Sequence, residues 1–96
     1  MAPMPVSLVT GTSTGIGFAT ALYLGRHGHT VVATMRNLAK AAPLEAAARE
    51  QGVRLAVREL DVTSQASIDR AMAETQAREG AVDVLVNNAG IGGATP

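Results

Sequence analysis

The chain has 96 residues, 47% of them hydrophobic, which is enough for one domain with an apolar core. Its 8 basic and 8 acidic residues balance, and the lack of a basic stripe argues against nucleic acid as a partner. It has no cysteine, which excludes disulfides, thiolate metal sites and cysteine nucleophiles. Its apolar stretches are too short for a membrane span, and its N-terminus does not resemble a secretory signal. We therefore expect one cytoplasmic domain over residues 1–96 that binds neither membranes nor nucleic acid.

Short apolar, β-branched runs alternate with helical patterns along the chain. The runs predict strands at Val6–Val9, Thr30–Met35, Val53–Leu60 and Val82–Asn87. The segments between them predict helices from Ile16 to Gly28, from about Pro43 to Gly52, and from a cap at Thr63 or Ser64 to about Arg78. The chain therefore reads β-α-β-α-β-α-β without a linker.

Apolar residues recur at regular spacings within these elements. In the first helix they recur at Ile16, Ala19, Ala21, Leu22 and Tyr23. Val53, Leu55 and Val57 share one face of the third strand, and the third helix has a stripe of Ile68, Ala71, Met72 and Thr75. The last strand is apolar on both faces, which is typical of parallel sheets covered by helices. With right-handed crossovers, the pattern predicts an α/β fold, the N-terminal half of a doubly wound parallel sheet with strand order 3-2-1-4.

Three glycines, Gly11, Gly15 and Gly17, occupy the junction between the first strand and the first helix. In a doubly wound sheet this turn lies where dinucleotides bind, and the helix N-terminus offers unpaired N–H groups to a pyrophosphate. Bare backbone would let the phosphates approach, and Gly17 would let the helix lie close to the sheet. The spacing G-x-x-x-G-x-G differs from the commoner G-x-G-x-x-G, and a tight turn without a ligand is the alternative explanation.

The end of the second strand carries no carboxylate, because Thr34, Met35 and Arg36 occupy it. An acidic residue is usual there in proteins that bind the ribose hydroxyls of NAD. A guanidinium can instead pair with a 2′-phosphate in a bidentate manner. The sequence thus favours NADP over NAD, although Arg36 is equally compatible with a solvated surface arginine.

Polar groups also follow the third and fourth strands. Asp61 can accept a hydrogen bond from an adenine amino group, or it can cap the next helix. After the fourth strand, Asn88, Ala89 and Gly90 would let a ribose lie against the backbone, whereas Asn87 can bridge to a neighbouring strand. All these features lie at carboxyl ends of parallel strands, the edge where such sheets bind ligands.

The segment Thr10–Gly17, the pair Asp61-Val62 and the run Asn87-Asn88-Ala89-Gly90 together resemble the short-chain dehydrogenase/reductase family, a Rossmann-fold family. The T-G-x-x-x-G-I-G and N-N-A-G elements match it without departure. Ala33-Thr34-Met35-Arg36-Asn37 is similar to the branch with hydroxysteroid and retinol dehydrogenases, which generally prefer NADP.

The resemblance implies a role for each matching position. Asp61 and Val62 would flank the adenine, Arg36 with Ser13 or Thr14 would hold the 2′-phosphate, and Asn87 would have a structural role alone. The pyrophosphate and adenosine side would be lined by Gly11, Ser13, Thr14, Gly15 and Ile16. The riboses would lie beside Asn88, Ala89 and Gly90.

The family's proton-transfer groups, a Tyr-x-x-x-Lys pair with a serine and an asparagine, belong to a later part of the chain. Tyr23 is followed four residues on by His27, and the single lysine is Lys40, so we expect Tyr23 in packing and no catalytic residue here. His27 and His29 are expected to be surface loop histidines rather than metal ligands. We therefore expect the cofactor-binding part of a truncated NADP-dependent oxidoreductase that interconverts a carbonyl and an alcohol and forms a dimer or tetramer. A non-catalytic nucleotide-binding or interaction module is the alternative.

Overall fold

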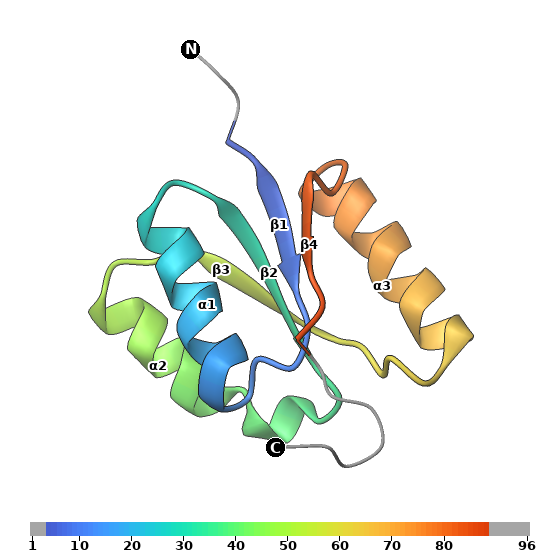
Figure 1. Ribbon diagram of the computed structural model, residues 1–96, viewed down its shortest axis with the longest axis horizontal. Coiled ribbons are helices and arrows are strands. Elements are labelled where there is room, and N and C mark those ends of the chain that lie inside the picture. Colours follow the sequence, from blue (N-terminus) through green and yellow to red (C-terminus); the bar gives the residue numbers. More distant parts are fainter. Residues whose placement is uncertain (1–3, 89–96) are drawn as a thin grey trace.

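Four parallel strands and the helices that connect them form the computed structural model, which describes residues 4–88 (Figure 1). The strands are β1 (Val6–Val9), β2 (Thr30–Met35), β3 (Leu55–Glu59) and β4 (Val84–Val86). The helices are α1 (Gly15–Arg26), the short 3-10 helix η1 (Leu38–Lys40), α2 (Ala42–Glu50) and α3 (Gln65–Arg78). The strands pair in the order β3-β2-β1-β4, all parallel, which confirms the predicted order 3-2-1-4.

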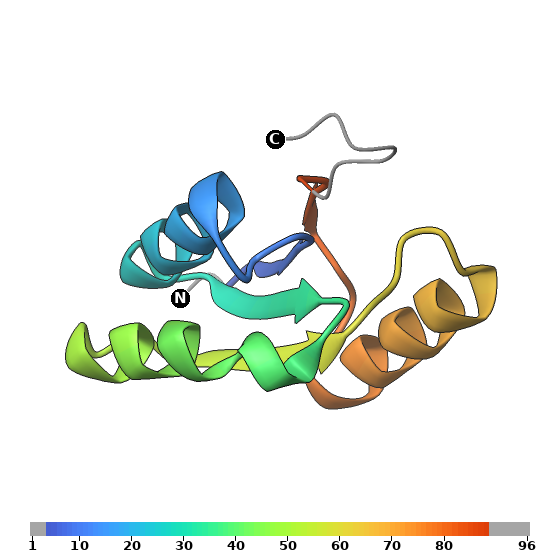
Figure 2. The same ribbon diagram turned by 90° about the horizontal axis from the view of Figure 1, so that it is seen from below.

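The helices cover the sheet from both sides, with α1 and α2 on one side and α3 on the other (Figure 2). The core beneath α1 and α2 includes the predicted face of β3, with Val53 buried and Leu55 and Val57 packed against it. The core beneath α3 contains Ala71, and Ile68 and Met72 pack against it. These residues confirm the predicted buried faces of the third strand and the third helix.

The apolar spacing that predicted a helix from Ile16 is confirmed by α1, but its apolar residues do not share one buried face. Ala21 and Leu22 are buried together with Gly17, whereas Ile16, Ala19 and Tyr23 are exposed. The face that meets the sheet is built around a glycine, which a count of apolar side chains does not register. The ring of Tyr23 stacks on His27, with their centroids 4.2 Å apart.

The last predicted strand is shorter than expected, because only Val84–Val86 forms β4. It is an edge strand that pairs with β1. Val84 and Val86 are half-buried, but Leu85 is 58% exposed. Of the two faces expected to be buried, the one that carries Leu85 is therefore open in this part of the structure.

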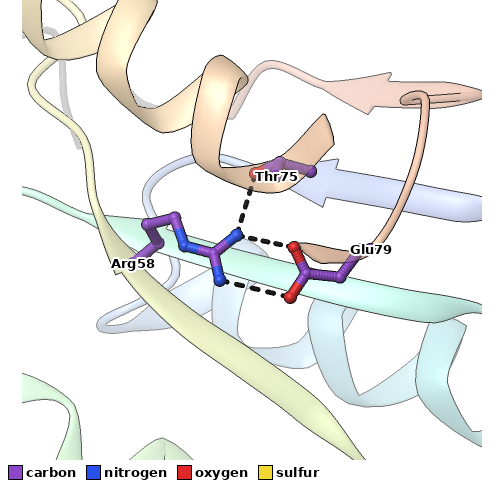
Figure 3. A network of polar contacts seen from close by, with 3 residues as sticks. All are labelled: Arg58, Thr75 and Glu79. Atoms are coloured by element: carbon purple, nitrogen blue, oxygen red, sulfur yellow. Dashed lines mark hydrogen bonds and ion pairs between the residues drawn. The ribbon is translucent and has the colours of Figure 1, made fainter. Parts of the chain in front are cut away.

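A buried ion pair, which the sequence did not predict, joins β3 to the C-terminal end of α3 (Figure 3). The Arg58 guanidinium donates two hydrogen bonds to the Glu79 carboxylate, at 2.7 and 3.2 Å, and a third to the Thr75 hydroxyl at 2.9 Å. These bonds to Glu79 raise the pKa of Arg58 above its ordinary value, so the buried guanidinium stays charged and α3 is fixed against the sheet. Within residues 4–88, no helix is long and apolar enough to span a bilayer.

Candidate functional site

The loop between β1 and α1 lies at the carboxyl edge of the sheet, next to the ends of β2 and β4 (Figure 1). Gly11 and Gly15 give this loop its path, because both have a positive φ, 66° and 63°, which residues with a Cβ adopt only at a cost. A Cβ built on Gly15 would meet no atom within 4 Å. The loop therefore needs glycine at this position for its backbone conformation, and the backbone there is bare toward the outside.

Gly17 serves a different purpose, because it allows close packing. A Cβ at this position would overlap the carbonyl oxygen of Gly11 and would lie 2.7 Å from Nδ2 of Asn88. The helix, the loop and the segment after β4 thus meet at a point where only hydrogen fits. Gly17 was expected to let the helix lie close to the sheet, and the close contacts that it makes are with the loop at Gly11 and with Asn88 after β4.

The N-terminus of α1 has no anionic or polar side chain of the described region to satisfy it. Its N-cap, Thr14, makes no side-chain cap hydrogen bond, and its first turn has no acidic residue. The helix α3 differs, because the hydroxyl of Ser64 accepts a hydrogen bond from the N–H of Ser67. Uncapped N–H groups together with the helix dipole give α1 a positive end that suits a bound anion.

Two buried threonines attach the loop to β2. Thr12 donates to the carbonyl of Thr34 from both its N–H, at 3.1 Å, and its hydroxyl, at 3.0 Å. The hydroxyl of Thr34 in turn donates to the carbonyl of Val9 at 3.0 Å. This pairing was not predicted from the sequence. The only signal for it is that one polar side chain lies next to a glycine turn and another lies at a strand end.

On its other side the loop is attached to the segment after β4. The Thr10 hydroxyl donates to Oδ1 of Asn87 and accepts from the N–H of Asn88 at 2.8 Å. Nδ2 of Asn88 donates to the carbonyl of Gly11 at 3.3 Å. Asn87 therefore bridges to a neighbouring strand as expected, and Asn88 makes a structural contact as well.

Arg36 and Asp61 follow β2 and β3. The pKa of Asp61 is lowered chiefly by the hydrogen bonds that its Oδ1 accepts from the hydroxyl and N–H of Thr63, at 2.7 and 3.0 Å, and to a smaller extent by the charge of Arg36. The carboxylate thus stays ionised and closes a turn, while the cap of α3 is Ser64. The alternative of Asp61 as the helix cap is therefore wrong.

The backbone of Asp61 is fixed too. Its N–H donates to the hydroxyl of Ser67 at 2.8 Å, and its carbonyl accepts from the N–H of Ser64. Val62 next to it is half-buried and packs against the core beneath α3. These contacts hold one carboxylate in a defined place at the end of β3.

The remaining predicted residues lie around the same loop or outside the described region. Ser13 is half-buried and Thr14 exposed, and Ile16 is 75% exposed at the start of α1, where an apolar surface faces outward. Ala89 and Gly90 lie outside residues 4–88, so their placement stays a prediction.

The two histidines lie away from this edge and contact different groups. Nδ1 of His27 contacts the carbonyl of Tyr23, whereas Nδ1 of His29 contacts the hydroxyl of the buried Ser7. His29 is half-buried, so it is a structural residue rather than the surface loop histidine we expected. Among residues 4–88 no group of three or more potential metal ligands occurs.

An open groove of about 380 Å³ lies between α2 and β3. Its lining includes Arg49, Val53 and Arg54. It shares no residue with the glycine loop.

Comparison with known proteins agrees with this geometry. Residues 5–96 match the family model described as short chain dehydrogenase. A 3beta-hydroxysteroid dehydrogenase of Mediterraneibacter gnavus is 41% identical over 90 residues, covering 94% of this chain and 33% of the relative. Human (Homo sapiens) retinol dehydrogenase 8 is 47% identical over 89 residues, covering 88% and 28%. The chain thus spans about a third of the length of the curated relatives it matches.

Solved structures share the fold as well. A variant of actinorhodin polyketide ketoreductase with NADPH superposes with a TM-score of 0.87 at 40% identity, covering 97% of this chain and 36% of that one. A metagenomic short-chain oxidoreductase in complex with NADP gives a TM-score of 0.84 at 38% identity, covering 92% and 40%. Because the family model matches residues 5–96, nearly the whole chain, the chain belongs to the short chain dehydrogenase family.

Proposed function

We propose that this chain binds NADP(H) at the carboxyl edge of its sheet and is the cofactor-binding part of an oxidoreductase that interconverts a carbonyl and an alcohol. The observation that carries the proposal is the uncapped N-terminus of α1 behind the glycine loop. Bound anions stabilise such a helix end by the same amides that are otherwise left to water.

The residues present fit a dinucleotide by their chemistry. First-turn amides of α1 suit the pyrophosphate, and the contact at Gly17 fixes where they start. The Asp61 carboxylate suits the adenine amino group, because one of its oxygens is engaged by Thr63 and the described residues leave the other without a hydrogen bond. Ile16 offers an apolar surface beside the loop.

The preference for NADP rests on Arg36. It is exposed, and no hydrogen bond within residues 4–88 engages its guanidinium, so the group is available to a 2′-phosphate. Two structural relatives are described with NADPH or NADP, which supports the same preference. Ser13 or Thr14, on the adjacent loop, would complete the phosphate site.

When bound, the cofactor supplies a hydride acceptor or donor at its nicotinamide. The chain's own contribution is to hold the pyrophosphate, adenine and 2′-phosphate so that the nicotinamide has a fixed place, with Asn88 and the predicted Ala89 and Gly90 beside the riboses. Tyr23 lies in the C-terminal half of α1, away from this edge, and takes no part. Proton transfer at the substrate is therefore assigned to other residues of the full-length enzyme.

Fluorescence titration of the full-length protein with NADPH and NADH tests the proposal. We expect saturable binding of both, with NADPH tighter, and we expect Arg36→Gln to weaken NADPH while leaving NADH nearly unchanged. Absence of binding by either nucleotide would overturn the proposal. NADPH oxidation with hydroxysteroid- and retinoid-type carbonyls tests the reaction, because a nucleotide-binding module without catalysis would bind NADPH but consume none. A dimer or tetramer stays a prediction, which light scattering of the same sample tests.

A further inference from the structure

Two fully buried threonines, Thr12 and Thr34, connect the glycine loop between β1 and α1 to the end of β2, which Arg36 follows. Resting on the proposed NADP site, we propose that Thr12 and Thr34 are positioning residues that set the preference for NADP over NAD. They do so by holding the loop residues Ser13 and Thr14 in a fixed place relative to Arg36, without touching the cofactor themselves.

Three hydrogen bonds connect Thr34 of β2 to Val9 before the loop and to Thr12 within it. The Thr34 hydroxyl donates to Val9, the last residue of β1, at 3.0 Å. The Thr34 carbonyl accepts from both the N–H and the hydroxyl of Thr12, at 3.1 and 3.0 Å. Both side chains are 0% exposed. Val9, just before the loop, and Thr12, within the loop, are thus both bonded to Thr34 of β2.

This attachment lies immediately next to the groups that would bind the 2′-phosphate. Ser13 follows Thr12, and Arg36 is two residues beyond Thr34. Because consecutive Cα atoms are about 3.8 Å apart, the attachment limits how far the loop and the guanidinium can move apart. A phosphate bound from both elements requires them at one separation, and a misplacement of about 1 Å weakens such contacts severely.

The pyrophosphate site is held by other contacts, on the opposite side of the loop. Gly17 packs on Gly11, and Asn88 donates to the Gly11 carbonyl. Loosening the Thr12–Thr34 attachment should therefore disturb the 2′-phosphate contacts more than the amides of α1. A change in the ratio of the two nucleotide affinities distinguishes this role from a general structural one.

The fold itself does not require these hydroxyls. The Thr34 carbonyl keeps the Thr12 N–H as a donor if the Thr12 hydroxyl is removed, and valine fills nearly the same volume as threonine. The net contribution of one such hydrogen bond is modest, so the valine variants should fold. Thr12→Ser keeps the hydroxyl and is the conservative variant.

The test uses fluorescence titration of the full-length protein to measure the dissociation constant of NADH divided by that of NADPH. We expect Thr12→Val to lower this ratio about threefold to tenfold, as loss of one hydrogen bond predicts, with the NADH affinity within about twofold of the parent. Thr34→Val should act in the same direction, and Thr12→Ser should restore the ratio. Ser7→Ala removes another fully buried hydroxyl, which contacts Nδ1 of His29 away from the carboxyl edge, and should leave the ratio unchanged.

The same ratio is then measured in a protein that already carries Arg36→Gln. If Thr12 acts through Arg36, adding Thr12→Val to Arg36→Gln should not lower the ratio further. Equal weakening of both nucleotides by Thr12→Val, or an unchanged ratio while Arg36→Gln abolishes the preference, would overturn the inference but not the NADP site. An unchanged ratio in Arg36→Gln itself would overturn both the assigned preference and the inference.

Discussion

Replacing Gly17 by alanine should damage both the fold and the nucleotide site, because the new methyl group has no space. It would overlap the Gly11 carbonyl oxygen and lie 2.8 Å from the Gly11 carbonyl carbon and 2.7 Å from Nδ2 of Asn88. Ordinary contacts begin near 3.4 Å, and the loop backbone cannot rotate away as a side chain can. We therefore expect α1 to move outward from the loop.

The magnitude follows from two opposing effects. Overpacking against a fixed neighbour costs about 3 kcal/mol, at the upper end of the usual range. Alanine in place of glycine within a helix returns about 1 kcal/mol. The free energy of unfolding should thus fall by roughly 2 kcal/mol for Gly17→Ala. Because the first-turn amides move with the helix, NADPH affinity should fall at least about tenfold, a loss of about 1.4 kcal/mol.

Gly25→Ala is the matched control, with the same substitution in the same helix. Its methyl group would overlap only Cγ1 of Val53, a side-chain atom, and the next contacts are ordinary at 3.4 and 3.6 Å. Urea unfolding gives the stability of both variants, and NADPH titration gives the affinity. We expect Gly25→Ala to lose less stability than Gly17→Ala and to bind NADPH as the parent does. A Gly17→Ala protein with parental stability and parental affinity would refute the reasoning from close packing.

Three further predictions concern charged and polar groups. Glu79→Ala leaves the Arg58 guanidinium buried without its carboxylate, so urea unfolding should show a loss of about 3 kcal/mol or more, and an unchanged midpoint would contradict this. Asp61→Ala should weaken NADPH but not the analogue with hypoxanthine in place of adenine, since that base lacks the amino group; equal losses for both in a titration would exclude the adenine contact. Thr63→Val removes the hydroxyl hydrogen bond that most lowers the pKa of Asp61, so an NMR titration should show that pKa rising toward 3.8. The lowered pKa means that the ionised carboxylate stabilises the native turn above the ordinary pKa and that this contribution is lost as the pH falls through the lower native value; a pKa unmoved in the variant would refute the assignment.

The sheet was predictable because parallel strands leave a distinct pattern. Thr30–Met35 is β-branched and apolar on both faces, which few other structures allow, and the structure forms β2 over the same residues. The cap of α3 was narrowed to Thr63 or Ser64, and Ser64 makes the bond. The short helix η1 was not predicted, because one turn held by the side chain of Asn37 has no periodicity to detect.

The features that escaped prediction depend on pairs of residues far apart in the chain. Arg58 gains its partner Glu79 only through the placement of α3. The Thr12 hydroxyl finds its acceptor, the carbonyl of Thr34, across 22 residues. The helical spacing of apolar residues in α1 includes Ile16, but Gly17 beside it occupies the contact point. A single sequence carries no signal for such pairings until the topology is known.

Different residues hold the glycine loop on its β4 side and on its β2 side. In the proposed site, the two sides would serve different parts of the nucleotide. Toward β4, Asn88 donates to the carbonyl of Gly11, on which Gly17 of α1 packs. In the proposed site these contacts would place the amides that any dinucleotide uses. Toward β2, Thr12 and Thr34 hold the loop next to the strand end that Arg36 follows, so in the proposed site they would place the group that distinguishes a 2′-phosphate from a hydroxyl. We therefore expect changes on the β2 side to alter the nucleotide preference while the contact at Gly17, and with it the affinity common to both nucleotides, is preserved.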